Sequence, residues 1–173
     1  SHKNHIKRRE AGAEEGGHDT NGGEEEYWCE SKINMTEEKT RVGVGVMIFK
    51  NNKILLGKRK SVLGKGEYAS PGGHLEYMES FEACARRETM EEAGIEIQNV
   101  RFLVLINLKK YAPRHYVHIG MVADWKSGEP KVLEPEKLES WGWYDLDKIP
   151  EPYFGTTSIT LEAYKTGRNF LDM

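Results

Sequence analysis

The chain has 173 residues, of which 38% are hydrophobic and 31% are charged, and its formal net charge is −3. This length suits one compact domain with extra residues at one end, and a domain of about 130 residues buries enough surface to fold without disulfides. The small net charge argues against a nucleic-acid binder held by overall positive charge. The sequence contains no run of about 18 apolar residues, so a membrane span is not expected.

Residues 1–34 differ in composition from the rest of the chain. The segment begins with a basic, polar stretch and continues with residues rich in Gly and Glu. Such a sequence has too little apolar surface to offset the entropy lost on ordering. We expect a flexible tail or a leader foreign to the domain, followed by a folded domain over residues 35–173. Cys29 and Cys84 form no metal-ligand spacing, which favours free thiols and a cytoplasmic protein.

The first regular elements are two predicted strands. Residues 41–49 are a buried strand in which valines at alternate positions share one face. After a turn of two asparagines, residues 53–59 resume a strand pattern. Glycines and a proline mark residues 64–73 as a loop. Residues 80–93 favour a helix, with a serine at its start and a glycine just after its end as capping residues.

The second half of the domain continues with strands predicted over residues 100–108, 116–125 and 141–144, and with a terminal helix over residues 157–166. Trp141 and Trp143 share one face of the third strand; we expect Trp143 to pack in the core, and the role of Trp141 stays open. Strands interrupted by two helices indicate a mixed α/β or α+β domain.

Three glutamates of the predicted helix suggest chemistry. Glu88, Glu91 and Glu92 stand at positions i, i+3 and i+4, which places them on one helix face, where like charges destabilise a helix. One interpretation is a solvated face paired with neighbouring arginines. The other is a site for hard divalent cations such as Mg²⁺, which prefer oxygen ligands. The preceding loop, Pro71–Gly73, favours the second, because glycine lets the backbone approach a metal or a phosphate.

The spacing of these residues resembles the Nudix box. From Gly73 the sequence has five residues, Glu79, seven residues, Arg87-Glu88, two residues, Glu91-Glu92, one residue, Gly94 and the aliphatic Ile95. Only Thr89 departs from the usual pattern, in which an aliphatic residue is commoner there. The resemblance implies a Nudix hydrolase with an α/β/α sandwich and a mixed β-sheet.

The resemblance also implies roles for the residues of the box. Glu88, Glu91 and Glu92 would bind Mg²⁺, with Mn²⁺ as an alternative, and the Gly73 carbonyl would be a further ligand. Arg87 would orient the catalytic cluster by pairing with Glu79, and one of the helix glutamates would serve as the general base if no later acid does.

Glu136 and Glu139 are the later acids that could act as this base, or they could simply form a surface turn before a strand. They belong to segments that resemble MutT-like nucleoside triphosphate diphosphatases of animals and plants. The segments with this resemblance are Leu56–Arg59, Pro71–Glu76, His115–Val117, Glu134–Lys137 and Glu139–Trp143. Members of this branch often dimerise, so a homodimer is expected.

Substrate contacts are expected around the glycine loop and the later strands. Lys58 and Arg59 either meet phosphates or lie on the surface. His115 and His118 are predicted on the same side of a strand, where they line the substrate pocket or pack. The full set of expected substrate-binding residues is Lys58, Arg59, Ser70, Gly72, His74, His118 and Phe154.

Three positions depart from the pattern of the branch. Ser70 stands where leucine is usual, His118 replaces a small or hydroxyl residue, and Gly155 follows Phe154 where tryptophan is usual. These changes either reshape a base pocket or open it to another diphosphate.

The predicted activity is metal-dependent hydrolysis of a nucleoside triphosphate, oxidised nucleotides included, to a monophosphate and diphosphate. One alternative is a diphosphatase for a non-nucleotide substrate such as a prenyl diphosphate. Another is a nucleotide sensor without catalysis, although such proteins usually lose carboxylates of the box. Neither a nucleic acid nor a membrane is expected as a partner.

Overall fold

The structure is a computed structural model that describes residues 39–173. Cys29 and the predicted tail lie outside this range, so the boundary at residue 35 stays a prediction. Within the range, the chain forms eight strands and two helices in this order: β1 (Arg41–Lys50), β2 (Lys53–Arg59), β3 (Tyr68–Ala69), β4 (Gly72–His74), α1 (Phe81–Ala93), β5 (Glu96–Leu108), β6 (Tyr116–Ser127), β7 (Leu138–Asp145), α2 (Gly155–Thr166) and β8 (Phe170–Asp172). None of these helices is long and apolar enough to cross a membrane.

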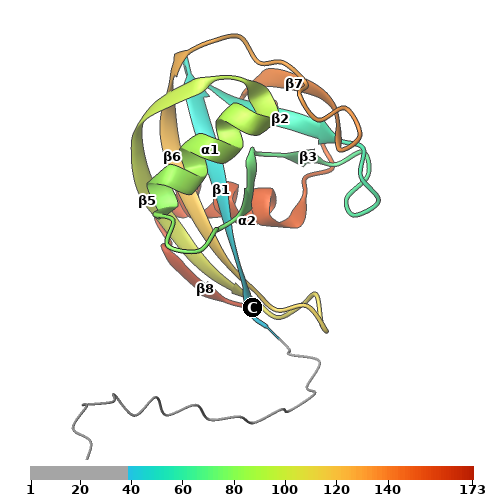
Figure 1. Cartoon of the computed structure of the whole chain (residues 1–173), viewed down its shortest axis with the longest axis vertical. Coiled ribbons are helices and arrows are strands. Elements are labelled where there is room, and N and C mark those ends of the chain that lie inside the picture. Colours follow the sequence, from blue (N-terminus) through green and yellow to red (C-terminus); the bar gives the residue numbers. More distant parts are fainter. Residues whose placement is uncertain (1–38) are drawn as a thin grey trace, which may run out of the picture. The chain divides into compact units, whose positions relative to one another are not determined.

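The strands form one mixed sheet in the order β3-β2-β1-β6-β5-β8, in which β4 pairs with β1 and β7 with β2 (Figure 1). Strand β1 is parallel to β6 and antiparallel to β2 and β4. The last strand, β8, is parallel to β5. A mixed sheet with two helices confirms the predicted α+β class.

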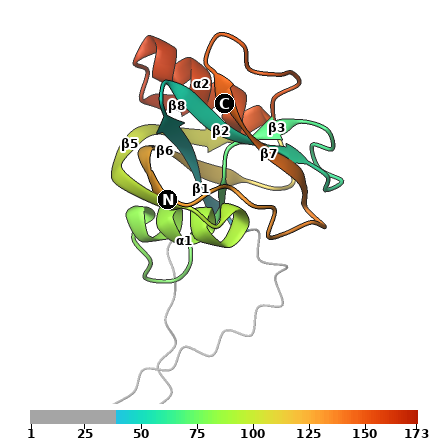
Figure 2. The ribbon, with the colours of Figure 1, turned by 90° about the horizontal axis from the view of Figure 1, so that it is seen from above.

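The helices α1 and α2 cover opposite faces of the sheet (Figure 2). Alternation along β1 separates the two sides of the core. Val44, Val46 and Ile48 pack with Cys84 of α1, and Trp141 and Trp143 also pack against this cluster, as predicted for Trp143. On the other side of the sheet, Met47 packs with Leu161 of α2. The structure therefore has the predicted three layers.

Several features of the fold differ from the sequence prediction; among them, β6 ends at Ser127, β7 begins at Leu138 and α2 begins at Gly155. Strand β5 begins at Glu96, not at residue 100. The prediction missed its first residues because register shifts around residues 98–101 interrupt the alternation that marks a strand. Strands β3, β4 and β8 were absent from the prediction, since two or three residues are too few to show a period. The predicted loop over residues 64–73 therefore contains β3 and the start of β4.

The helix α1 is fixed at both ends and along its buried side. The Ser80 hydroxyl accepts a hydrogen bond from the Ala83 N–H at 3.1 Å, and the helix ends at Gly94 in the left-handed conformation. Thr89 is fully buried, but its hydroxyl donates to the Ala85 carbonyl at 2.7 Å. This bond satisfies the hydroxyl within the helix, so threonine is tolerated where the box usually has an aliphatic residue.

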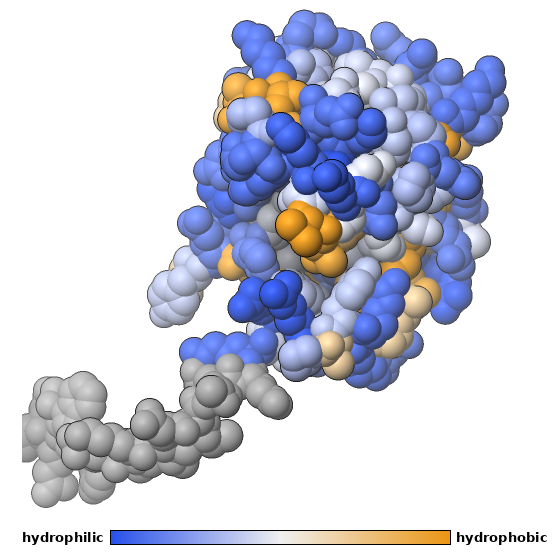
Figure 3. All heavy atoms as spheres, turned by 90° about the vertical axis from the view of Figure 1, so that its right-hand side faces the viewer, coloured by the Kyte–Doolittle hydropathy of each residue, from blue (hydrophilic) through white to orange (hydrophobic). Residues whose placement is uncertain are grey.

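The face of the molecule shown in Figure 3 is mostly hydrophilic, with hydrophobic groups in small, separate patches. The loop between β2 and β3 exposes Val62 and Leu63. Leu63 also lines a cavity of about 440 Å³, so this loop reaches the wall of that cavity.

Removing the cap of α1 should lower stability without changing the core. For Ser80→Ala we expect the free energy of unfolding to fall by about 1 kcal/mol, because one N–H of the first helical turn loses its acceptor. Urea denaturation followed by circular dichroism measures this change. Ser158→Ala, at an exposed position inside α2, is the matched control and should be neutral or slightly stabilising. Equal effects of the two substitutions would contradict the role of the cap.

Candidate functional site

The glutamate face of α1 lies against the glycine loop. A Cβ atom added to Gly73 would collide with the Glu88 carboxylate, so only glycine lets this carboxylate approach the backbone of β4. The Glu88 side chain is 13% exposed, whereas that of Glu91 is 56% exposed. The same helix face therefore holds one enclosed and one open carboxylate.

Arg87 supplies the positive charge that the glutamates need. Its Nε and Nη2 atoms donate to the two oxygens of Glu79 at 2.8 and 2.9 Å, a bidentate pair. Its Nη1 donates to Glu88 at 2.7 Å and to Glu91 at 3.2 Å, and Nη2 also donates to the His74 carbonyl at 3.1 Å. The hydrogen bonds from Arg87 lower the pKa of Glu79 to about 2. The predicted pairing of Arg87 with Glu79 is thus confirmed.

Glu92 is the acid of the cluster that contacts Gly72. Its Oε2 accepts a hydrogen bond from the Gly72 N–H at 3.0 Å. Burial, with a smaller contribution from the charges of Glu88 and Glu134, raises the pKa of Glu92 to about 7, although the bond from Gly72 opposes this shift. A carboxyl with such a pKa binds and releases a proton near neutral pH. The Glu92 backbone carbonyl is held in turn by Trp141, whose Nε1 donates to it at 3.1 Å.

The donor set of this cluster fits a hard divalent cation. Its side chains offer carboxylate oxygens, and the Gly73 backbone against which Glu88 lies carries a carbonyl, so every donor is oxygen. No three acids, histidines or cysteines of residues 39–173 stand in a ready-made ligand cage. Arg87 instead bridges Glu88 and Glu91, so a cation at this cluster would compete with its guanidinium for these two carboxylates.

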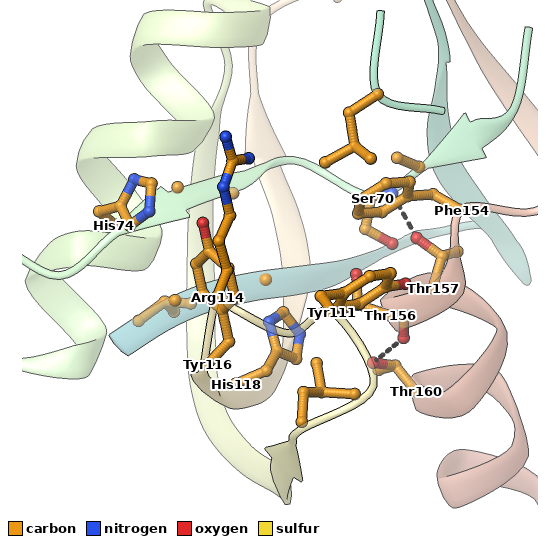
Figure 4. A pocket seen from close by; sticks show the side chains of 18 of the residues that line it. Ser70, His74, Tyr111, Arg114, Tyr116, His118, Phe154, Thr156, Thr157 and Thr160 are labelled. Carbon is orange, nitrogen blue, oxygen red and sulfur yellow. Dashed lines mark hydrogen bonds between the residues drawn. The ribbon is translucent and has the colours of Figure 1, made fainter. Parts of the chain in front are cut away.

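A cavity of about 440 Å³ opens on the other side of the same glycine loop. It lies between the sheet, the start of α2 and the loop that joins β5 to β6 (Figure 4). Gly72 and Gly73 line it, and both also touch the glutamate cluster. A ligand in the cavity can therefore reach the acids of α1 at this one place.

Charged and aromatic side chains shape the walls of the cavity. The Arg59 guanidinium lies 4.2 Å from the ring centre of Phe154, and both residues line the cavity. Tyr111 enters from the β5–β6 loop. A Cβ on Gly155 would collide with the Tyr111 hydroxyl, so the tyrosine uses space left by the missing side chain. This contact explains physically how glycine fits at position 155, where the sequence pattern suggested tryptophan.

Of the seven predicted substrate-binding residues, the structure brings six to this cavity. These six are Arg59, Ser70, Gly72, His74, His118 and Phe154. Lys58 does not line it, because its Nζ donates to Glu139 at 3.1 Å away from the cavity wall. Whether the six residues contact a substrate stays a prediction.

Glu136 and Glu139 lie at the surface around the start of β7, which agrees with the second of the two alternatives, a surface turn before a strand. Glu139 is paired with Lys58, and Glu136 is exposed. Glu134 instead lines a small cavity together with Glu92, and it is held there by Lys137 at 2.6 Å. Of these three acids, only Glu134 lines a cavity together with Glu92; which acid serves as the general base stays a prediction.

The prediction that His115 and His118 share one side was wrong. Two strand residues three positions apart point to opposite faces. His118 lines the cavity, whereas His115 lies just before β6 and bonds to Asn107 at 2.6 Å and to Thr40 at 3.0 Å.

Several cavity residues were not foreseen from the sequence. They include Tyr111, Arg114, Tyr116, Thr156, Thr157 and Thr160. Alternation in the strand gave a signal for Tyr116, which lies two positions before His118. The threonines could have been noticed as hydroxyls at i, i+1 and i+4 on the first turns of the terminal helix. No sequence signal identified Tyr111 or Arg114, because the path of their loop is set by tertiary contacts.

Comparisons with known proteins agree with this geometry. The sequence profile of the NUDIX domain matches residues 39–162. A MutT NUDIX hydrolase from Burkholderia pseudomallei of known crystal structure is 36% identical, with a TM-score of 0.68 over 72% of this chain and 98% of that one.

Curated relatives carry more specific names. The NAD-capped RNA hydrolase NudC of Pseudomonas syringae is 29% identical over 85% of this chain and 52% of its own length. The oxidized purine nucleoside triphosphate hydrolase of Danio rerio is 28% identical over 61% of this chain and 66% of its own length. The chain spans about half or less of the NudC proteins that it matches.

Glu79 should make the free energy of unfolding depend on pH in the acid range. Its pKa is lower in the folded protein, about 2, than its ordinary value of 4.5, so its contribution is complete above pH 4.5 and is lost as the pH falls towards 2. We expect Glu79→Gln to lower the free energy of unfolding by about 1–3 kcal/mol at pH 7, since charged hydrogen bonds are lost. The difference from the parent protein should shrink steadily below pH 4.5.

Urea titrations from pH 2.5 to pH 8 measure this dependence. Glu76→Gln, at an exposed position of the same loop, is the control and should show little difference at any pH. A Glu79→Gln deficit that did not change between pH 7 and pH 3 would contradict an ionic role for Glu79.

Proposed function

Since the chain belongs to the NUDIX domain family, we propose that it is a metal-dependent hydrolase that cleaves a diphosphate bond in a nucleoside triphosphate-like substrate. The products would be a nucleoside monophosphate and inorganic diphosphate. The observation that carries this proposal is the placement of Gly72 and Gly73, which separate a cluster of three glutamates from a cavity of about 440 Å³. A substrate in the cavity would present its phosphates at this boundary.

Glu88, Glu91, Glu92 and the Gly73 carbonyl are the groups that would hold Mg²⁺, or Mn²⁺ in its place. Such ions neutralise phosphate oxygens and make a bound water more acidic. The chain itself supplies orientation: Arg87 fixes Glu88 through Nη1 and is fixed in turn by its two bonds to Glu79. This arrangement keeps the carboxylates in place before a ligand binds.

The groups that would contact the substrate lie on the cavity side. Arg59 is held by Ser61 and by the Leu63 carbonyl, both at 3.1 Å, so its guanidinium is already fixed at the wall. It also lines the small cavity that contains Glu92. We therefore propose that Arg59, and not Lys58, meets the phosphates of the substrate.

The substrate class is supported by the names of relatives and by the cavity. The Danio rerio relative is named for oxidized purine nucleoside triphosphates and the NudC relatives for NAD-capped RNA, so both names refer to nucleotides. We propose nucleoside triphosphates, oxidised ones included, as the first substrates to test, as for the MutT-like branch. A sensor without catalysis is the weaker proposal, because the chain keeps all the acids of the box.

A prenyl diphosphatase is the second candidate. It is favoured by the apolar part of the cavity wall, to which Met47, Leu63 and Leu108 contribute. A cytoplasmic location and a homodimer are further proposals that rest on the sequence.

The activity should depend on the enclosed acids of α1. With Mg²⁺ and the preferred nucleoside triphosphate, we expect Glu92→Gln and Glu88→Gln each to lower kcat by about 100-fold or more. The physical reason is that an amide keeps the shape of the side chain and removes the charge that a cation and a proton need. Release of diphosphate and of monophosphate measures turnover, first on a panel of nucleoside triphosphates, nucleotide sugars and prenyl diphosphates.

Glu82→Gln is the matched control, because Glu82 is on the same helix and pairs with Arg86 at the surface. This control should retain turnover close to that of the parent protein. Full turnover by both Glu88→Gln and Glu92→Gln would show that the metal assignment is wrong. Tight nucleotide binding with no turnover of any substrate would favour the sensor.

A further inference from the structure

His118 is placed on the floor of the cavity by two glycines of the neighbouring strand. It lies in β6, and β1 runs beside it with Gly43 and Gly45. A Cβ on Gly45 would lie 2.8 Å from Cε1 and 3.0 Å from Nε2 of the imidazole, and a Cβ on Gly43 would lie 3.7 Å from Nδ1. A side chain at position 45 would therefore displace the ring. The absence of side chains at Gly43 and Gly45 leaves the space in which the ring packs against the sheet.

The ring nitrogens of His118 have no partner within the described part of the chain. Unlike His115, His118 makes no side-chain hydrogen bond to any residue from 39 to 173. Among the described residues, the polar side-chain atom that is fully buried without a hydrogen-bond partner is Nε1 of Trp143. The nitrogens of His118 are therefore not fully buried. They are open to the cavity, and Figure 4 shows the ring pointing into it between Tyr116 and Tyr111.

The imidazole is uncharged under ordinary conditions. Burial lowers the pKa of His118 to about 4. A neutral imidazole has one N–H donor and one bare nitrogen acceptor. Both kinds of hydrogen bond are therefore available on the cavity floor.

The other polar groups of the cavity also favour a ligand rich in acceptors. Its fully charged side chains are Arg59 and Arg114, and no Asp or Glu is among the described residues that line it. Arginines donate hydrogen bonds and never accept them. Tyr111 and Tyr116 add aromatic surface on which a flat ring can stack.

We propose that His118 is a specificity-determining residue that hydrogen-bonds the edge of a heteroaromatic base, so the cavity takes a nucleotide and not a prenyl chain. This inference rests on the proposed diphosphatase function and deepens it. A prenyl tail over the floor would remove water from the ring nitrogens without replacing their hydrogen bonds, which costs binding free energy. A base satisfies them. The same asymmetry lets a site built for hydrogen bonds reject an analogue that lacks them.

Two substitutions of His118 separate hydrogen bonding from shape. Phenylalanine keeps a flat ring and has no nitrogen, whereas glutamine keeps a donor and an acceptor. For His118→Phe we expect the affinity for a nucleoside monophosphate, measured by calorimetry without metal, to fall about 10- to 100-fold. KM for the triphosphate should rise by a similar factor while kcat changes little, because the lost contact is remote from the phosphates. His118→Gln should bind within a few-fold of the parent protein.

The controls use the same assays. His115→Gln changes a histidine outside the cavity and should leave nucleotide binding unchanged. Thermal unfolding checks that each variant is folded; if the phenylalanine does not fit, His118→Met, which is flexible and also lacks nitrogen, takes its place and should show the same loss.

The outcomes distinguish this inference from the proposed function. Undiminished nucleotide binding by a folded phenylalanine or methionine variant would overturn the role of His118. So would a parent protein that turns over a prenyl diphosphate faster than any nucleotide, although the diphosphatase proposal would stand. Nucleotide binding that depends on His118 without any turnover would uphold the inference and defeat the proposed hydrolase.

Discussion

The bidentate pair between Arg87 and Glu79 is the interaction on which the site depends. Three glutamates on one helix face repel one another, and a positive charge among them offsets this repulsion. Arg87 provides this charge, and Glu79 holds its guanidinium from the loop before the helix. The bond from Arg87 then fixes the position of Glu88 against Gly73. The cluster is thus arranged by the fold before any ligand arrives.

The second constraint is the absence of side chains at Gly72 and Gly73. Strand β4 pairs with β1 at this point, and the backbone of Gly72 and Gly73 contacts both the acids of α1 and the cavity. Helices on opposite faces of the sheet can serve one site because these two residues of the wall between them carry no side chain. Position 155 is similar, since its glycine leaves the space that Tyr111 occupies in the cavity wall.

Much of the fold and the α1 side of the site could be predicted from the sequence, and much of the cavity could not. Periodicity located β1, β2 and α1, and the box spacing assigned Glu79 to Arg87, because these relations are local or shared with a family. Tyr111 and Arg114 are contributed by a loop whose path depends on tertiary contacts. Glu134 was passed over for Glu136 and Glu139 because spacing does not show which turn residue faces Glu92. His118 was noticed as a departure from the pattern, but its orientation needed the structure.

Glu88, held against Gly73, is central to the proposed centre that cleaves the diphosphate bond. The most direct measurement of this role is turnover of a nucleoside triphosphate by Gly73→Ala, with thermal unfolding to confirm that the variant is folded. The added methyl group must displace the Glu88 carboxylate, so we predict that activity falls by about 100-fold or more while nucleoside monophosphate binding in the cavity persists. A folded Gly73→Ala variant with the turnover of the parent protein would contradict this role of Glu88.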